Sequence, residues 1–143
     1  MQTTIRHILE VKGYDFWNIR PDASVYDALR MMSTKDVGAL IVMEDDHMVG
    51  IMSERDYARK VVLLGKSSRE TLVSEIMSKK VFTIHPDQTV EEAMDMMTTR
   101  HVRHLPVVEN DRVIGIISIG DVVKAIIYKQ RQDIKDMESR INP

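Results

Sequence analysis

Two serine–aspartate pairs at the same spacing are the residues of this chain best suited to bind a ligand. Ser53 lies three residues before Asp56 in GIMSERDY, and Ser118 lies three residues before Asp121 in GIISIGDV. At a helix start, such a serine caps a free backbone N–H and the acid bonds back to the N–H of the serine. Glutamate would close this box at least as well, and a carboxylate in the first turn of a helix can also accept hydrogen bonds from both hydroxyls of a ribose. A purely capping role and a ligand-binding role both remain open.

Other chemistries lack the residues that they need. The chain has no cysteine, which excludes disulfides, thiolate metal sites and cysteine nucleophiles. His101 and His104 stand three apart without a nearby carboxylate or third histidine, so they do not indicate zinc. No serine has a positioned base, and the glycines occur singly rather than in a phosphate-binding loop. We therefore expect neither a metal nor catalysis.

Length and charge narrow the class of protein. A chain of 143 residues with 43% hydrophobic residues can bury one ordinary core, or two small halves that share one. The net charge is −2 and basic residues are scattered among acidic ones, which argues against a nucleic-acid partner. No stretch approaches the roughly 20 apolar residues of a membrane span. We expect a cytoplasmic protein without a membrane partner.

The serine–aspartate motifs belong to a longer internal repeat. Residues 19–56 align without a gap to residues 84–121 at an offset of 65, and 17 of the 38 aligned positions are identical. Each copy starts with a short apolar segment, FWNI or VFTI, and a Pro-Asp turn, followed by a helix, two strands and a second helix. The repeat therefore predicts two β-α-β-β-α units in an α+β fold.

Domain boundaries follow from the repeat. We predict a first repeat with an N-terminal helix over residues 1–65, a linker helix and second repeat over 66–130, and a charged, projecting C-terminal tail over 131–143. The second helices carry more apolar residues than one buried face needs. This surplus predicts a homodimer through the helices, and deeper burial within the monomer is the alternative. The residues concerned are Val61, Val62, Leu63, Leu64, Val122, Val123, Ile126 and Ile127.

From about Ile5 to Tyr128 the chain resembles the cystathionine-β-synthase (CBS) domain pair, or Bateman module. The resemblance is carried by VGALIVME with GIMSERDY and by VRHLPVVE with GIISIGDV, two copies in register. The chain is similar to stand-alone CBS proteins that act as bacterial and organellar regulators. The resemblance implies two units packed sheet to sheet with pseudo-two-fold symmetry, a dimer through the helices, and a regulated partner protein of unknown identity. It also implies an adenosine ligand, such as AMP, ADP, ATP, NAD or S-adenosylmethionine, in clefts between the units, without catalysis.

The resemblance assigns roles to residues of a main cleft. It implies that Asp121 binds ribose, that Arg103 and His104 face the phosphates, and that small residues of the other repeat line the base. Arginine can direct two donors at a phosphate, and histidine adds a proton-dependent donor. The residues predicted for this cleft are Tyr14, Trp17, Val37, Gly38, Ala39, Arg103, His104, Ile116, Ser118, Gly120 and Asp121.

A second, less favoured cleft is implied around Asp56. Its phosphate positions are Gly38 and Ala39, which carry no charge, so this cleft is expected to hold adenosine or a neutral ribose, or to stay empty. Arg55 either reaches a phosphate or lies on a solvated helix face. The residues predicted here are Ser53, Arg55, Asp56, Thr83 and Val102. A ligand-independent dimeric scaffold is the alternative function.

Overall fold

The chain folds into two compact units in the computed structural model, which describes residues 2–141. Residues 16–82 form one, the first-repeat unit; residues 2–15 and 83–141 form the other, the second-repeat unit. The predicted boundary at residue 65 differs from this division. The N-terminal helix joins the second repeat and residues 66–82 join the first, because each of these segments packs on a strand of that unit.

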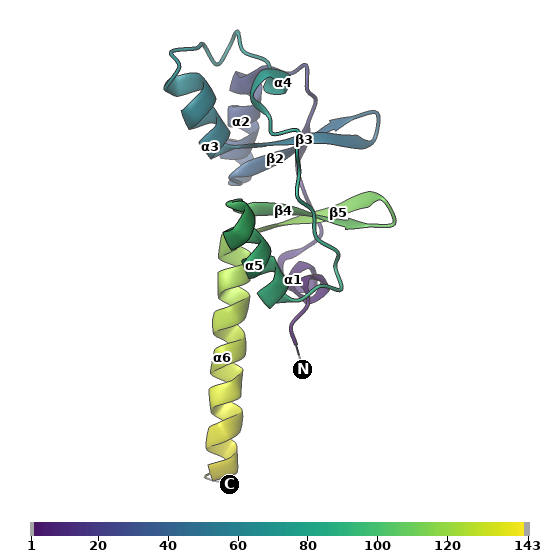
Figure 1. Cartoon of the computed structure of the whole chain (residues 1–143), viewed down its shortest axis with the longest axis vertical. Helices are drawn as coiled ribbons and strands as arrows, with labels where there is room; N and C mark the ends of the chain where they lie inside the picture. The colour runs from purple at the N-terminus through teal and green to yellow at the C-terminus, as the bar shows by residue number, and fades with distance from the viewer. Residues whose placement is uncertain (1, 142–143) are drawn as a thin grey trace. The chain divides into compact units, whose positions relative to one another are not determined.

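The first-repeat unit contains a three-stranded sheet in the order β1-β2-β3, and Figure 1 shows its two longer strands, β2 and β3. β1 pairs in parallel with β2, and β2 pairs antiparallel with β3. Its core consists of buried side chains from the sheet, from α2 and from α4. The elements are β1 (Asn18–Ile19), α2 (Val25–Lys35), β2 (Ala39–Glu44), β3 (His47–Ser53), α3 (Glu54–Tyr57), the π-helix η1 (Ala58–Val62) and α4 (Val73–Ile76).

The second-repeat unit has the same order of helices and strands, with one strand fewer. The antiparallel pair β4–β5 matches β2–β3, and Ile84 makes a single parallel bridge to Val107 where the first repeat has β1. The prediction of a full strand at VFTI is therefore wrong, although a single bridge forms at the predicted position. The elements are α1 (Ile5–Lys12), α5 (Val90–Arg100), β4 (His104–Glu109), β5 (Arg112–Ser118) and α6 (Ile119–Ile141).

Local signals in the sequence are confirmed in both units. The Ser24 hydroxyl accepts a hydrogen bond from the Asp27 backbone N–H at 3.0 Å, and the Thr89 hydroxyl caps α5 in the same way. Both hairpin turns place two residues at positive φ, Asp45–Asp46 and Asn110–Asp111, as tight hairpins require. The α+β class is therefore confirmed, and the repeated β-α-β-β-α order holds with a single bridge in place of the first strand of the second repeat.

Packing explains why a glycine recurs in both hairpins. A Cβ on Gly115 would lie 2.9 Å from a methyl of Leu9 in α1, and a Cβ on Gly50 would lie 2.7 Å from the Met77 sulfur, just after α4. Real Cβ atoms do not approach so closely, so these glycines allow a helical segment to lie directly on the strand. Gly120 differs, because its Cβ would meet nothing closer than the Ser118 hydroxyl at 3.6 Å.

Two expectations about the second helices are wrong. The predicted boundary at residue 130 falls inside α6, which continues to Ile141 because no glycine or proline interrupts it after Gly120. Val61 and Val122, counted in the surplus apolar stripe, are buried within their own units at 1% and 0% exposure. Within the described range, every helix is too short or too polar to cross a lipid bilayer.

We predict that Gly115→Ala lowers the free energy of unfolding by about 1–3 kcal/mol, because the added methyl overpacks the contact with Leu9. Urea denaturation measures the effect. Gly120→Ala is the control and should unfold at the same urea concentration or slightly above it, since alanine favours helix. Equal midpoints for Gly115→Ala and wild type would contradict the packing role.

Candidate functional site

The junction of β5 and α6 holds the Asp121 carboxylate in a fixed position. The Asp121 backbone N–H donates to the Ser118 hydroxyl at 3.2 Å, and the Ser118 N–H donates to Asp121 Oδ2 at 2.8 Å. The predicted capping box is therefore confirmed. The Asp121 side chain is 19% exposed, so a polar group in solution can still reach the carboxylate.

A lysine from the other end of the chain contacts the same carboxylate. Lys12 Nζ donates to Asp121 Oδ2 at 2.7 Å and to the Ile116 carbonyl at 2.8 Å. Lys12 is the last residue of α1, which ends at Gly13 with φ 109°. No sequence motif links residues 109 apart, so reasoning from the repeat missed this ion pair.

The pKa values of this cluster follow from burial and from the lysine. Burial raises the pKa of Asp121, but hydrogen bonds from Lys12 and from the Ser118 N–H and hydroxyl outweigh it and hold that pKa below its usual value. Burial lowers the pKa of His104, and the Lys12 and Arg103 charges add to that effect while Asp121 opposes it. At neutral pH the site therefore contains an ionised carboxylate and a neutral imidazole.

Six residues predicted for the main cleft lie together in the second-repeat unit. His104 is the strand partner of Ser118, and the Arg103 carbonyl accepts a hydrogen bond from the Ile119 N–H at 2.9 Å. Arg103 and Gly120 are exposed, whereas His104 is partly buried. Tyr14, two residues after Lys12, is 44% exposed. The residues gathered at this junction are Arg103, His104, Ile116, Ser118, Gly120 and Asp121.

The first-repeat unit repeats the aspartate box with a different lysine. The Ser53 N–H and hydroxyl donate to Asp56 Oδ2 at 2.9 and 3.0 Å. Lys60 Nζ lies 3.4 Å from Asp56 Oδ1 and donates to the Ile76 carbonyl at 2.9 Å. At the offset of 65, Lys12 corresponds to Met77 and Lys60 to Ala125. The two lysines reach equivalent aspartates from non-equivalent positions, which no repeat alignment reveals.

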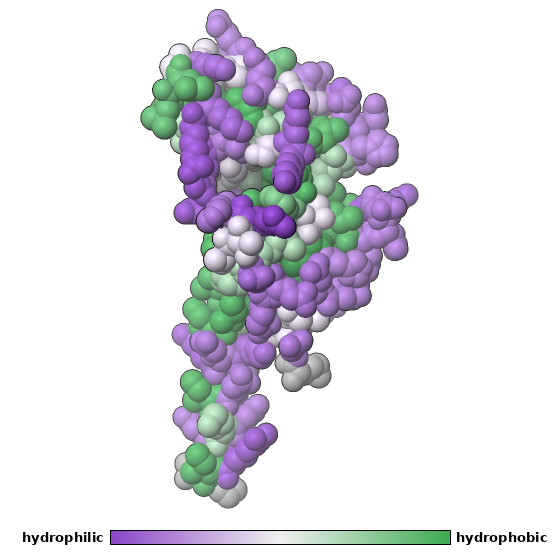
Figure 2. All heavy atoms as spheres, in the orientation of Figure 1, coloured by the Kyte–Doolittle hydropathy of each residue, from purple (hydrophilic) through white to green (hydrophobic). Residues whose placement is uncertain are grey.

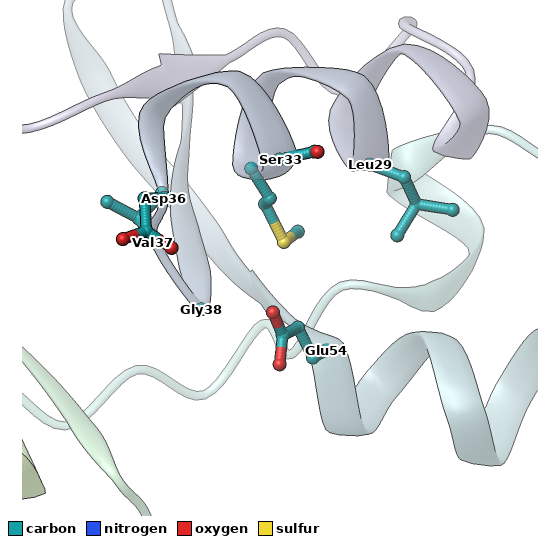
Figure 3. Close-up of a pocket in the computed structure, with 7 residues that line it drawn as sticks. Leu29, Ser33, Asp36, Val37, Gly38 and Glu54 are labelled. Atoms are coloured by element: carbon teal, nitrogen blue, oxygen red, sulfur yellow. The ribbon is translucent and has the colours of Figure 1, made fainter.

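A hollow of about 490 Å³ opens between the end of α2 and the start of α3 (Figure 3). Two of its residues, Val37 and Gly38, were predicted to line the base. Its described lining carries carboxylates and no cation, so it suits a flat apolar or amino-bearing group better than a phosphate. The lining residues missed from the sequence are Leu29, Met32, Ser33, Asp36 and Glu54.

The remaining predicted residues are described within their own units. Ala39 is buried in β2, and Trp17 is 39% exposed with Lys35 Nζ 4.2 Å from its ring centre. Arg55 is partly exposed next to Asp56, while Thr83 and Val102 belong to the second-repeat unit. Both predicted clefts combine residues of the two units, and they stay predictions.

One cluster of metal-type ligands was not predicted. Ligand atoms of His85, Asp87 and Glu109 lie within 4.8 Å of one another. Arg6 donates to the Asp87 carboxylate at 3.1 Å and to the Glu109 carboxylate at 2.6 Å, which raises the pKa of Arg6. The single guanidinium binds both carboxylates and offsets one of their two negative charges, so the cluster is an ion-pair network that holds α1 to Asp87 and to the β4 hairpin.

Three comparisons with known proteins, by family model, by sequence and by structure, point to the same family. The CBS domain model matches residues 4–63 and 73–128. The mitochondrial CBS domain-containing protein CBSX3 of Arabidopsis thaliana is 38% identical over 97% of this chain and 72% of its own length. The CBS domain structure NE2398 superposes with a TM-score of 0.85 at 43% identity, covering 89% of this chain and 99% of that one.

A more distant structure was solved with ligands. The CBS domain pair of protein MJ0100, in complex with 5′-methylthioadenosine and S-adenosyl-L-methionine, has a TM-score of 0.80 at 24% identity, and the match covers 90% of this chain and 99% of that chain. At this identity the likeness concerns the fold.

We predict that Lys12→Met raises the pKa of Asp121, because the hydrogen bond and the positive charge disappear while burial remains. A depressed folded pKa stabilises the native state above the unfolded value of about 3.9, and this contribution is lost as pH falls through the folded pKa. In Lys12→Met that contribution should shrink. Carboxyl-carbon NMR titration of Asp121 measures the change, Lys60→Met is the control, and an unmoved titration in Lys12→Met would show that the ion pair does not set this pKa.

Proposed function

Because the chain belongs to the CBS domain family, whose members are regulatory modules, we propose that it senses an adenosine-containing ligand and modulates a partner protein. The ligand class is AMP, ADP, ATP or NAD. Its ribose is held by Asp121 in a cleft between the two repeats. A ligand produces a signal only if it binds two arrangements of the protein with different affinity, and the partner reads that difference.

The observation that carries this proposal is the arrangement around Asp121. An ionised carboxylate stays partly accessible and is held at one place by the Ser118 box. Such a carboxylate accepts both hydroxyls of a ribose, and each charge-assisted bond contributes about 1.5–3 kcal/mol. Lys12, Arg103 and His104 lie near it, so a phosphate attached to the ribose finds donors close by.

The Asp56 site is proposed to differ in ligand. Its carboxylate has the same capping box, but the positions equivalent to Arg103 and His104 are Gly38 and Ala39. Without a cation at these positions, the site favours adenosine or a neutral ribose over a nucleotide.

Assembly is proposed to be a homodimer through the helices, in the cytoplasm. After the correction for Val61 and Val122, apolar side chains remain exposed on η1, on the turn that directly follows it and on α6. They are Val62, Leu63, Leu64, Val123 and Ile127, at 40–76% exposure. Exposed apolar groups of this kind are typical of protein–protein contacts. A ligand-independent dimeric scaffold would use the same residues and is the competing function.

Asp121→Ala is expected to weaken binding of AMP, ATP or NAD at least about tenfold, because the ribose hydroxyls lose their charged acceptor. Isothermal calorimetry with each ligand measures the loss. Asp95→Ala removes an exposed carboxylate from α5 of the same unit and is the matched control. If wild-type protein gives no binding heat with any of the three ligands, the scaffold is correct and the sensor proposal is wrong.

Arg103→Ala is expected to weaken AMP about tenfold or more while leaving adenosine nearly unchanged, because only the phosphate needs the guanidinium. The two affinities are compared by calorimetry, with Arg100→Ala, three residues earlier on α5, as control. An equal loss for adenosine and AMP would show that Arg103 supports the fold of the site rather than the phosphate.

A further inference from the structure

The last turns of α6 extend past the end of the family match. The CBS domain match ends at residue 128, whereas α6 continues to Ile141. Every residue from Asp133 to Ile141 is exposed. Most helical stability in proteins comes from packing of an apolar face, so a partner packed on this extension would stabilise it.

The extension carries a coiled-coil pattern. Ile127, Ile134 and Ile141 recur every seven residues, and Met137 lies three after Ile134. With these isoleucines at heptad position a, position d is held by Val123, Gln130 and Met137. The apolar members beyond Tyr128 are 55–73% exposed, and Figure 2 shows hydrophobic residues interspersed with hydrophilic ones along this part of α6. An a/d stripe that nothing covers within the unit is the face a second helix packs on.

The flanking charges select the direction of that second helix. Arg131 and Glu138 occupy e positions, and Asp133 and Arg140 occupy g positions. In a parallel pair, Asp133 would face Glu138 of the second copy, which repels. In an antiparallel pair that sets Ile134 against Met137 of the second copy, Asp133 faces Arg140 and Arg131 faces Glu138. All four flanking contacts then join opposite charges.

The polar residue in the stripe agrees with this register. A parallel pair would set two Gln130 amides against each other between apolar layers, where a polar residue in the core stripe lowers stability. The antiparallel register moves each Gln130 to the edge of the overlap, opposite Ile141, where its amide reaches water. It also limits the overlap to residues 130–141, the part of α6 that lies beyond the Lys129–Glu91 contact with α5.

We propose that residues 130–141 of α6 pair antiparallel with the same segment of a second copy, with Ile134 against Met137 of that copy. The partner helix is the same segment of a second copy, because the charges of the segment complement those of a second copy that runs in the opposite direction. This pairing lies outside the CBS match and requires no ligand, so it stands independently of the proposed sensor function.

Cysteine cross-linking tests the direction directly, because the chain has no native cysteine. Ile134→Cys mixed with Met137→Cys should form a mixed disulfide rapidly under mild oxidation. Ile134→Cys alone should form its homodimer at least about tenfold more slowly, since the two positions are not opposed. Faster cross-linking of Ile134→Cys alone, or no preference between the two, would overturn the antiparallel pairing.

Charge reversal provides a second test that keeps the apolar stripe intact. Asp133→Arg should weaken self-association about tenfold in sedimentation equilibrium, and adding Arg140→Asp should restore it. Asp136→Arg is the matched control, because it makes the same change at an outward position and, like Asp133→Arg, removes one intrahelical charge pair. Tighter association of Asp133→Arg would indicate parallel helices and overturn the proposal. Equal association of Asp133→Arg and Asp136→Arg would also overturn it, and so would a monomeric wild type.

Discussion

The hydrogen-bonded box between a serine and an aspartate three residues later is the constraint on which the site depends. In each repeat the box ends a strand, starts a helix and fixes a carboxylate at that corner. Aspartate is short enough to bond the serine backbone while remaining within the first turn. One side chain can therefore both cap the helix and bind a ligand. The capping role is present in both repeats.

The two repeats differ in what surrounds that carboxylate. Asp121 is met by Lys12 from α1, whereas Asp56 is met by Lys60 from the following helical turn. The Asp121 corner also contains Arg103 and His104, and the Asp56 corner has Gly38 and Ala39 in their place. Duplication preserved the box, and substitution around it made the electrostatics of the two corners unequal. That inequality is the physical basis for assigning different ligands to them.

The sequence predicted features that depend on neighbours in the chain or on the repeat. Capping boxes, hairpin turns and the β-α-β-β-α order are set by local residues, and all were predictable. Contacts between distant segments were not. The Lys12–Asp121 pair and the packing of Leu9 on Gly115 join residues more than 100 positions apart, and no pattern marks them. The division at residue 65 failed for the same reason, since α1 packs on the repeat that lies far from it in sequence.

We predict that the ribose of a bound nucleotide lies on Asp121. A crystal structure of the protein grown with AMP tests this most directly. It should show both ribose hydroxyls within about 3 Å of the Asp121 carboxylate, the usual distance of a charge-assisted hydrogen bond. AMP bound elsewhere, with the Asp121 carboxylate making no contact to it, would contradict the account.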